Sequence, residues 1–160
     1  MGFKGGLNCV QITMLWMIIL MDDVIAKALA SRTIAVVGLS KDPSKPSNDV
    51  ASYLLSRGYR IIPVNPTVDE VLGEKSYKTL LDLPDSIKNV LDVVDIFRRP
   101  EDIPQIVEEA IQLHAKYHRP TIIWTQLGIT NEMAARKARD AGLDVVMDRC
   151  MKIEHLRSKA

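Results

Sequence analysis

Residues 33–40 read Thr-Ile-Ala-Val-Val-Gly-Leu-Ser, and this stretch decides the fold. Its first five residues, Thr33–Val37, are all small or β-branched, which predicts a strand buried on both faces of a parallel sheet. Gly38 then allows a sharp turn or a close approach of another group to the backbone. A strand, a turn of small residues and a following helix bring free N–H groups and a positive helix end to one point. We therefore predict a phosphate-binding loop after this strand.

The composition is that of an ordinary soluble globular domain. The chain has 160 residues, of which 47% are hydrophobic and 26% charged, so one domain with a sizeable core is expected. A net charge of +1 gives no argument for a nucleic-acid partner. The two cysteines, Cys9 and Cys150, are far apart and form neither a disulfide framework nor a zinc pattern. We expect a cytoplasmic protein with no metal site, no nucleic acid and no membrane partner.

The N-terminus differs from the rest of the chain, because residues 10–21 are mostly apolar. This run is shorter than the about 20 apolar residues that cross a bilayer, and no small-residue cleavage site follows it. Several methionines, the last of them Met21, could each start translation. We expect residues 1–21 to be an extension that arises from a mis-assigned start, and residues 22–160 to form the folded domain. A hydrophobic appendage that packs on the domain or on a partner is the alternative.

Strands and helices alternate along the rest of the chain. We expect strands at 33–37, 59–64, 90–97, 121–125 and 145–147, a weak edge strand near 73–77, and helices over 22–30, 47–57, 100–114, 130–141 and from 151. This alternation predicts an α/β fold with a doubly wound, mostly parallel sheet and helices on both faces. Counting strands along the chain, the expected order is 3-2-1-4-5, plus strand 6. The ends of strands 33–37 and 90–97 then flank one crevice, where such sheets bind ligands.

The segments after the strands supply the candidate ligand contacts. They are Gly38, Ser40, Lys41, Lys45, Ser47 and Asn48, then Val64, Asn65 and Pro66, then Phe97, Arg98 and Arg99, and finally Gln126 and Gly128. Hydroxyl groups and cations of this kind bind phosphate, so the set predicts a site for a phosphorylated nucleotide. A dinucleotide fingerprint needs G-x-G-x-x-G and an acid after the second strand. Here Ser40 and Pro43 replace two of the glycines and Asn65 replaces the acid, which disfavours NAD. A P-loop is excluded, because no Gly-Lys-Ser/Thr follows at its spacing.

Six short segments together resemble one protein family. They are Gly-Leu-Ser at 38–40, Lys-Pro-Ser-Asn at 45–48, Ile-Ile-Pro-Val-Asn-Pro at 61–66, Asp-Ile-Phe-Arg-Arg-Pro-Glu at 95–101, Gln-Leu-Gly-Ile at 126–129 and Asp-Arg-Cys-Met at 148–151. The set resembles the small stand-alone CoA-binding domain proteins, which are Rossmann-like and similar to the CoA-binding domain of the succinyl-CoA synthetase α subunit. The resemblance covers residues 22–157. It implies coenzyme A binding but no reaction, since this family lacks the synthetase's phosphorylated histidine and second domain.

Coenzyme A would account for the residue types at the crevice. Its diphosphate would lie on the turn at residues 38–40 and near Ser47 and Asn48, and its pantetheine arm near residues 126–128. Adenine would lie against residues 64–66 or Phe97. The 3′-phosphate needs a cation, for which Lys41, Lys45 and Arg98 are the candidates. We therefore expect a CoA- or acyl-CoA-binding protein without catalysis of its own, and leave open whether it forms a homo-oligomer or has a protein partner.

Two other functions stay open at this point. Cys150 follows the last strand, precedes a helix and adjoins Arg149, surroundings that make a thiol reactive. One alternative is therefore an acyl-CoA-handling or CoA thiol–disulfide enzyme that uses Cys150, although a small buried hydrophobe is the simpler interpretation of this residue. The other is an NAD(P)-type nucleotide-binding regulator. We name no catalytic residue, because no nucleophile–base pair is apparent. Asp92 and Asp95 are unusual in a buried strand and have no assigned role.

Overall fold

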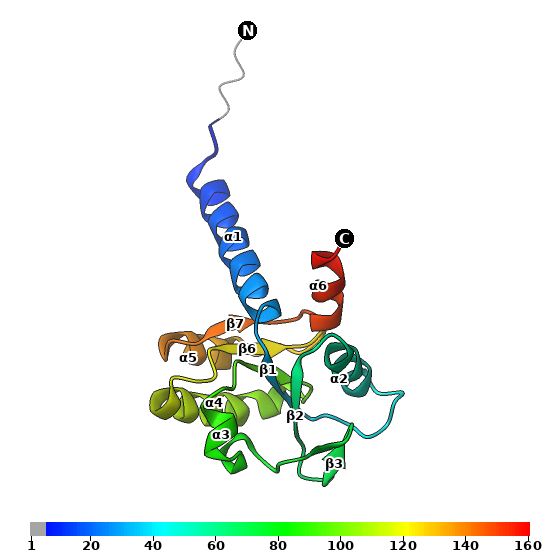
Figure 1. Cartoon of the computed structure of the whole chain (residues 1–160). Coiled ribbons are helices and arrows are strands. Elements are labelled where there is room, and N and C mark those ends of the chain that lie inside the picture. The colour runs from blue at the N-terminus through cyan, green and yellow to red at the C-terminus, as the bar shows by residue number, and fades with distance from the viewer. Residues whose placement is uncertain (1–5) are drawn as a thin grey trace.

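The computed structural model describes residues 6–160, which form a five-stranded parallel sheet between two layers of helices (Figure 1). The strands are β1 (Thr33–Val37), β2 (Arg60–Val64), β5 (Val93–Ile96), β6 (Ile122–Thr125) and β7 (Asp144–Val146), in the order β2-β1-β5-β6-β7. Helices α1 (Cys9–Leu29), α2 (Pro46–Ser56) and α6 (Met151–Ser158) cover one face, and α3 (Asp85–Lys88), α4 (Ile103–Tyr117) and α5 (Glu132–Asp140) cover the other. The predicted α/β, doubly wound fold is confirmed.

Strand β1 lies between β2 and β5 and is buried over its whole length. Because side chains alternate along a strand, Ile34 and Val36 join the core under α2 and α6, whereas Ala35 and Val37 join the core under α4. After β1 the chain crosses to α2 on one face, and after β5 it crosses to α4 on the other. The strand ends of β1 and β5 are thus the point where the sheet changes its direction of winding, and ligands bind at such points.

The predicted weak edge strand is not a full strand of this sheet. Residues 70–75 instead form a small antiparallel hairpin of β3 (Glu70–Val71) and β4 (Glu74–Lys75). Its two-residue turn, Leu72 and Gly73, has positive φ at both positions, the geometry that closes a tight hairpin. Only Tyr77 reaches the edge of the main sheet, in a single parallel bridge to Val64. Between the hairpin and β5 the chain makes a short 3-10 turn, η1 (Leu80–Asp82), and a second one, η2 (Pro100–Asp102), precedes α4.

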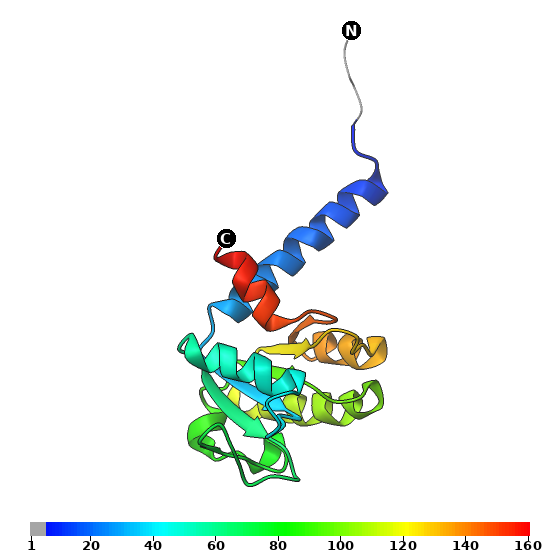
Figure 2. The same cartoon turned by 90° about the vertical axis from the view of Figure 1, so that its right-hand side faces the viewer.

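Helix α1 is longer than the helix predicted over residues 22–30. It begins at Cys9, where Asn8 and Gln11 form a reciprocal capping box. The helix projects from the domain (Figure 2), its residues 9–20 are exposed, and burial begins only in its second half, at Ile25 and Ala28. By length and composition alone it could cross a membrane, a test that signal sequences also pass. A domain that starts near Met21, and the absence of a membrane partner, therefore stay predictions.

Candidate functional site

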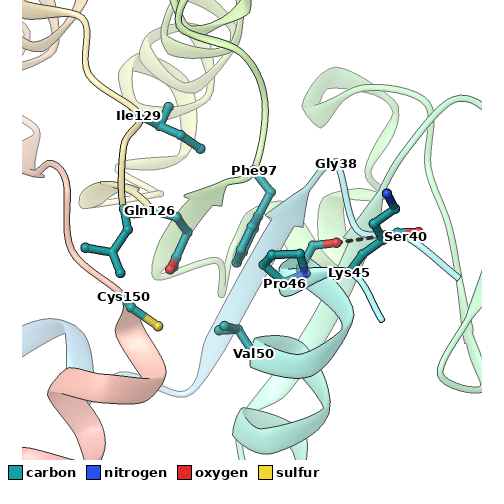
Figure 3. A pocket seen from close by; sticks show the side chains of 11 residues that line it. Gly38, Ser40, Lys45, Pro46, Val50, Phe97, Gln126, Ile129 and Cys150 are labelled. Atoms are coloured by element: carbon teal, nitrogen blue, oxygen red, sulfur yellow. Dashed lines mark hydrogen bonds between the residues drawn. The ribbon is translucent and has the colours of Figure 1, made fainter. Parts of the chain in front are cut away.

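The ends of β1, β5 and β6 open into a hollow of about 510 Å³ on the α2/α6 face, here called the first hollow (Figure 3). Most of its lining is apolar, with polar groups at its α2 end and at Gln126. The lining residues are Gly38, Ser40, Lys45, Pro46, Ser47, Val50, Phe97, Gln126, Leu127, Ile129 and Cys150. An apolar cleft with a few polar groups at a strand-end switch point is the usual form of a small-molecule site.

The turn at Gly38 brings β1 and β5 together at this site. Gly38 has φ +88°, and its N–H donates to the carbonyl of Val64 at 2.8 Å. A Cβ atom on Gly38 would lie 2.7 Å from the carbonyl oxygen of Phe97 and 3.3 Å from Cδ of Arg98. Glycine is therefore required here both by backbone conformation and by space. The missing side chain lets the backbone of Phe97 approach the turn at the edge of the first hollow.

The loop between β1 and α2 is held by its own polar side chains. The helix was expected to begin at residue 47, but α2 begins at Pro46 with Lys45 as the N-cap residue. Pro46 has a fixed φ that suits the first helical position, so the helix starts one residue earlier. The hydroxyl of Ser47 instead accepts from the N–H of Ser40 at 3.0 Å, and Asn48 donates from its side chain to the carbonyl of Ser40 at 2.8 Å. These bonds fix the turn around the hollow.

A second hollow of about 540 Å³ lies beside the first, across the same strand ends but on the α4 face. It takes in Val64, Pro66, Arg98 and Arg99 of the predicted set. The remaining lining residues are Val37, Lys78, Thr79, Asp102, Gln105, Ile106 and Glu109. The two hollows adjoin at the Gly38 turn, because Gly38 and Phe97 line the first while their chain neighbours Val37 and Arg98 line the second.

Of the two arginines that line the second hollow, one is paired with acidic side chains and the other is not. Arg99 is exposed and pairs with Glu101 and Asp102, at 3.5 and 3.3 Å. Arg98 is half-buried, lies beside Gly38, and makes no ion pair within residues 6–160. Glu109 accepts from the N–H of Leu80 at 3.1 Å, and burial raises the pKa of its carboxyl. Arg98 is thus the cation best placed to receive an anionic group.

The other predicted residues lie apart from both hollows. Lys41 and Asn48 line a third hollow next to the β3–β4 hairpin. The side chain of Asn65 donates to the carbonyl of Leu39 at 2.9 Å and accepts from the N–H of Thr67. It therefore holds two loop backbones in place. The N–H of Gly128 donates to the carboxylate of Asp148 at 2.7 Å. Conversely, Val50, Ile129 and Lys78 line the hollows without having been singled out; for Val50, its position one helical turn after Ser47 was the available signal.

A buried carboxyl is hydrogen-bonded to Gln126, one of the residues that line the first hollow. Asp95 is fully buried in β5, on the same face as Phe97 two residues later. Its Oδ1 accepts from Nε2 of Gln126 at 2.7 Å, and its Oδ2 has no partner among residues 6–160. Burial raises the pKa of Asp95 to about 7, and the hydrogen bond from Gln126 opposes this only in part. The carboxyl therefore orients Gln126, and titrates near neutral pH.

The loop that carries Cys150 is anchored to the end of β6. The indole N–H of Trp124 donates to the carbonyl of Arg149 at 2.7 Å, and the N–H of Arg149 donates to the carbonyl of Thr125 at 3.2 Å. Cys150 is the N-cap residue of α6 and is half-buried at the hollow. The side chain of Arg149 lies 3.4 Å from Glu154, so its charge is shared with that carboxylate rather than reserved for the thiol.

Comparison with known proteins finds relatives that match most of the chain. A family model described as "CoA binding domain" matches residues 32–156. The uncharacterized protein YneT of Bacillus subtilis is 40% identical over 129 residues, which cover 81% of this chain and 89% of that protein. A solved structure of a hypothetical protein from Pyrococcus horikoshii is 40% identical with a TM-score of 0.77, covering 87% of this chain and 92% of that one. An ADP-forming acetate–CoA ligase of Archaeoglobus fulgidus is 31% identical over 83 residues, 51% of this chain but 12% of that enzyme.

Proposed function

Since this chain belongs to the CoA-binding domain family, we propose that it binds coenzyme A or an acyl-CoA across the two adjoining hollows, without catalysing a reaction by itself. The observation that carries the proposal is their arrangement. A mostly apolar hollow adjoins, at the glycine turn of the switch point, a hollow whose lining includes several charged side chains. Coenzyme A has the matching form, with an uncharged arm at one end, a phosphorylated nucleotide at the other and a diphosphate between them.

The diphosphate would lie at the Gly38–Ser40 turn. Lys45 stands at the N-terminus of α2 and lines the first hollow, so a cation and the positive end of an 11-residue helix act at the same place. The one acidic residue in the first turn of α2, Asp49, is paired with Lys152 at 2.8 Å, which offsets its repulsion of an anion. Two negative charges are therefore favoured at this turn.

The nucleotide end would occupy the second hollow. Adenine would pack against Val64 and Pro66, and the 3′-phosphate would bind Arg98, with Lys78 nearby. An arginine that has no acid partner within residues 6–160 keeps both its charge and its donors for a phosphate. NAD lacks the 3′-phosphate, and Asn65 stands where a dinucleotide site has its ribose-binding acid. This arrangement favours coenzyme A over NAD.

The pantetheine arm would lie in the first hollow. Val50 and Phe97 supply apolar walls, and Gln126 supplies one amide group, whose nitrogen is held by Asp95. In Figure 3 the side-chain oxygen of Gln126 is turned toward the side of Cys150, where it can accept a hydrogen bond from an amide N–H of the arm. An acyl group on the sulfur would extend along the same apolar lining.

Titration calorimetry with CoA, 3′-dephospho-CoA and NAD tests the proposal. We expect CoA to bind tightest and dephospho-CoA to bind about tenfold to a hundredfold more weakly, because a charged hydrogen-bonded contact contributes about 1.5–3 kcal/mol. Arg98→Ala should weaken CoA binding to the level of dephospho-CoA, and Arg139→Ala, on the outer side of α5, is the matched control. Absence of CoA binding would refute the proposed function. Tighter binding of NAD would favour the NAD(P)-type regulator, and equal affinities for CoA and dephospho-CoA would exclude the role of Arg98.

A further inference from the structure

The first hollow contains a thiol as well as a binding surface. Of the two cysteines, Cys9 is exposed on α1 and Cys150 lines the hollow. Figure 3 shows the sulfur of Cys150 pointing toward Val50, into the space between α2 and α6. In the proposed function this is the end of the hollow that receives the arm of coenzyme A, whose terminal group is itself a thiol.

The backbone next to Cys150 is held by hydrogen bonds, which keeps this residue at the lining of the hollow. The bonds from Trp124 and to Thr125 hold Arg149, and Asp148, with φ +56°, accepts from the N–H of Gly128. The thiol then stands at the N-cap position of the eight-residue α6 and at the lining of the first hollow. A pre-positioned sulfur loses little freedom when it reacts with a bound partner.

A buried polar pair at the same hollow points to a ligand independently of the cysteine. Asp95 is paired in register with Trp124, the residue whose side chain anchors the Cys150 loop, and it is hydrogen-bonded to Gln126, which lines the hollow. Its Oδ2 has no hydrogen-bond partner among residues 6–160, although buried polar atoms are nearly always satisfied. An amide side chain held by Asp95 among apolar lining residues suits a chain of amides that ends in sulfur.

We propose that the first hollow is a thiol–disulfide exchange site at which Cys150 forms a mixed disulfide with coenzyme A. The proposal rests on the proposed function, because the nucleotide must hold the ligand while its sulfur reaches Cys150. The oxidant is CoA disulfide. The sulfur of Cys150 gives up its proton and attacks one sulfur of the disulfide. The new S–S bond forms as the old one breaks, and the second CoA leaves as a thiol carrying the proton. Cys150 is oxidised and one CoA sulfur is reduced.

Intact-mass spectrometry after incubation with CoA disulfide tests this step. We expect wild type to gain the mass of one CoA, the Cys9→Ser control to gain the same mass, and Cys150→Ser to gain none at the hollow. Pantethine, the disulfide of the same arm without the nucleotide, should react at least about tenfold more slowly, because it lacks the contacts that hold CoA in place. Lys45→Ala should reduce the rate with CoA disulfide more than the rate with pantethine, because pantethine carries no phosphate for Lys45 to bind.

The outcomes separate this inference from the proposed function. If wild type binds reduced CoA in the calorimeter but forms no adduct, or if the adduct lies on Cys9 alone, the exchange site is refuted while CoA binding stands. If pantethine reacts as fast as CoA disulfide, Cys150 is merely an accessible thiol and the exchange site is also refuted. If reduced CoA does not bind at all, the proposed function itself fails.

Discussion

Replacing Asp95 by asparagine should abolish one component of the pH dependence of stability. Asp95 is fully buried, and burial raises its pKa from 3.8 to about 7. Well below pH 3.8 the carboxyl is protonated in both the folded and the unfolded chain, and its pKa shift does not affect stability. Between pH 4 and 7 the unfolded chain ionises while the folded one does not, so stability falls as the pH rises. Above pH 7 both are ionised, and the full loss remains.

The size of this loss follows from the two pKa values. Each pKa unit corresponds to 1.36 kcal/mol, so a rise from 3.8 to about 7 lowers the free energy of unfolding by about 4 kcal/mol between low and high pH. Asparagine has the same shape and can accept from Gln126, but it does not ionise. It leaves a buried N–H group without a partner, which costs about 1–3 kcal/mol at every pH. The free energy of unfolding of Asp95→Asn, relative to that of wild type, should therefore rise by about 4 kcal/mol between low and high pH, of which about 3 kcal/mol falls between pH 4.5 and 8.5.

Urea unfolding at pH 4.5, 6 and 8.5, followed by far-UV circular dichroism and by the fluorescence of buried Trp124, measures this difference. Contributions of other titrating groups are common to both proteins and cancel. Asp140→Asn, at an exposed position near the end of α5, is the control for the change in net charge. If the free energies of unfolding of Asp95→Asn and wild type differ by the same amount at all three pH values, the pKa of Asp95 is not raised by burial and the argument is refuted.

Three further substitutions or deletions test other parts of the structure. Gly38→Ala places a Cβ 2.7 Å from the carbonyl oxygen of Phe97 at a positive φ, and should cost at least about 2 kcal/mol in urea unfolding; an unchanged midpoint would contradict the required glycine. Asp92→Ala removes a carboxylate that accepts from the N–H groups of Arg32 and Thr33 and pairs with Arg119 at 2.6 Å, and should cost about 2–4 kcal/mol; a loss below about 0.5 kcal/mol would contradict that role. A chain that begins at Met21 should keep the stability and the CoA affinity of the full chain, because residues 9–20 are exposed; a loss of more than about 1 kcal/mol, or of binding, would show that the N-terminal half of α1 belongs to the domain.

The parts of the fold that follow from local chemistry were predictable from the sequence. β1 was recognisable because its five residues are all small or β-branched, a pattern that predicts a strand buried on both faces, and all five are buried in the structure. Its glycine turn followed from the same stretch, and the structure places Gly38, Ser40, Lys45, Phe97 and Gln126 around one hollow. Residues that follow different strands could be assigned to one site because a doubly wound sheet brings the carboxyl ends of its strands to one edge.

The division of the crevice into two hollows was not predictable. It depends on which face of the sheet each loop crosses, and so Val64, Pro66 and Arg98 lie across the strand ends from Lys45 and Cys150. The roles of polar side chains in loops could not be predicted either, because an amide side chain can bind a ligand or hydrogen-bond to the protein's own backbone. Asn65, for example, donates to the carbonyl of Leu39. The partner of Asp95 could not be foreseen, since Gln126 comes from a separate strand end 31 residues away.

The most direct test of the central claim is to follow the backbone amide resonances of the protein during titration with coenzyme A. We predict that the largest shifts fall on residues 38–48, on Phe97 and Arg98, and on residues 126–128, with further shifts at Val64 as the nucleotide enters the second hollow. Shifts confined to the opposite end of the sheet, around Arg57 and Tyr59, or no shifts at saturating CoA, would contradict a CoA site at the switch point of the sheet.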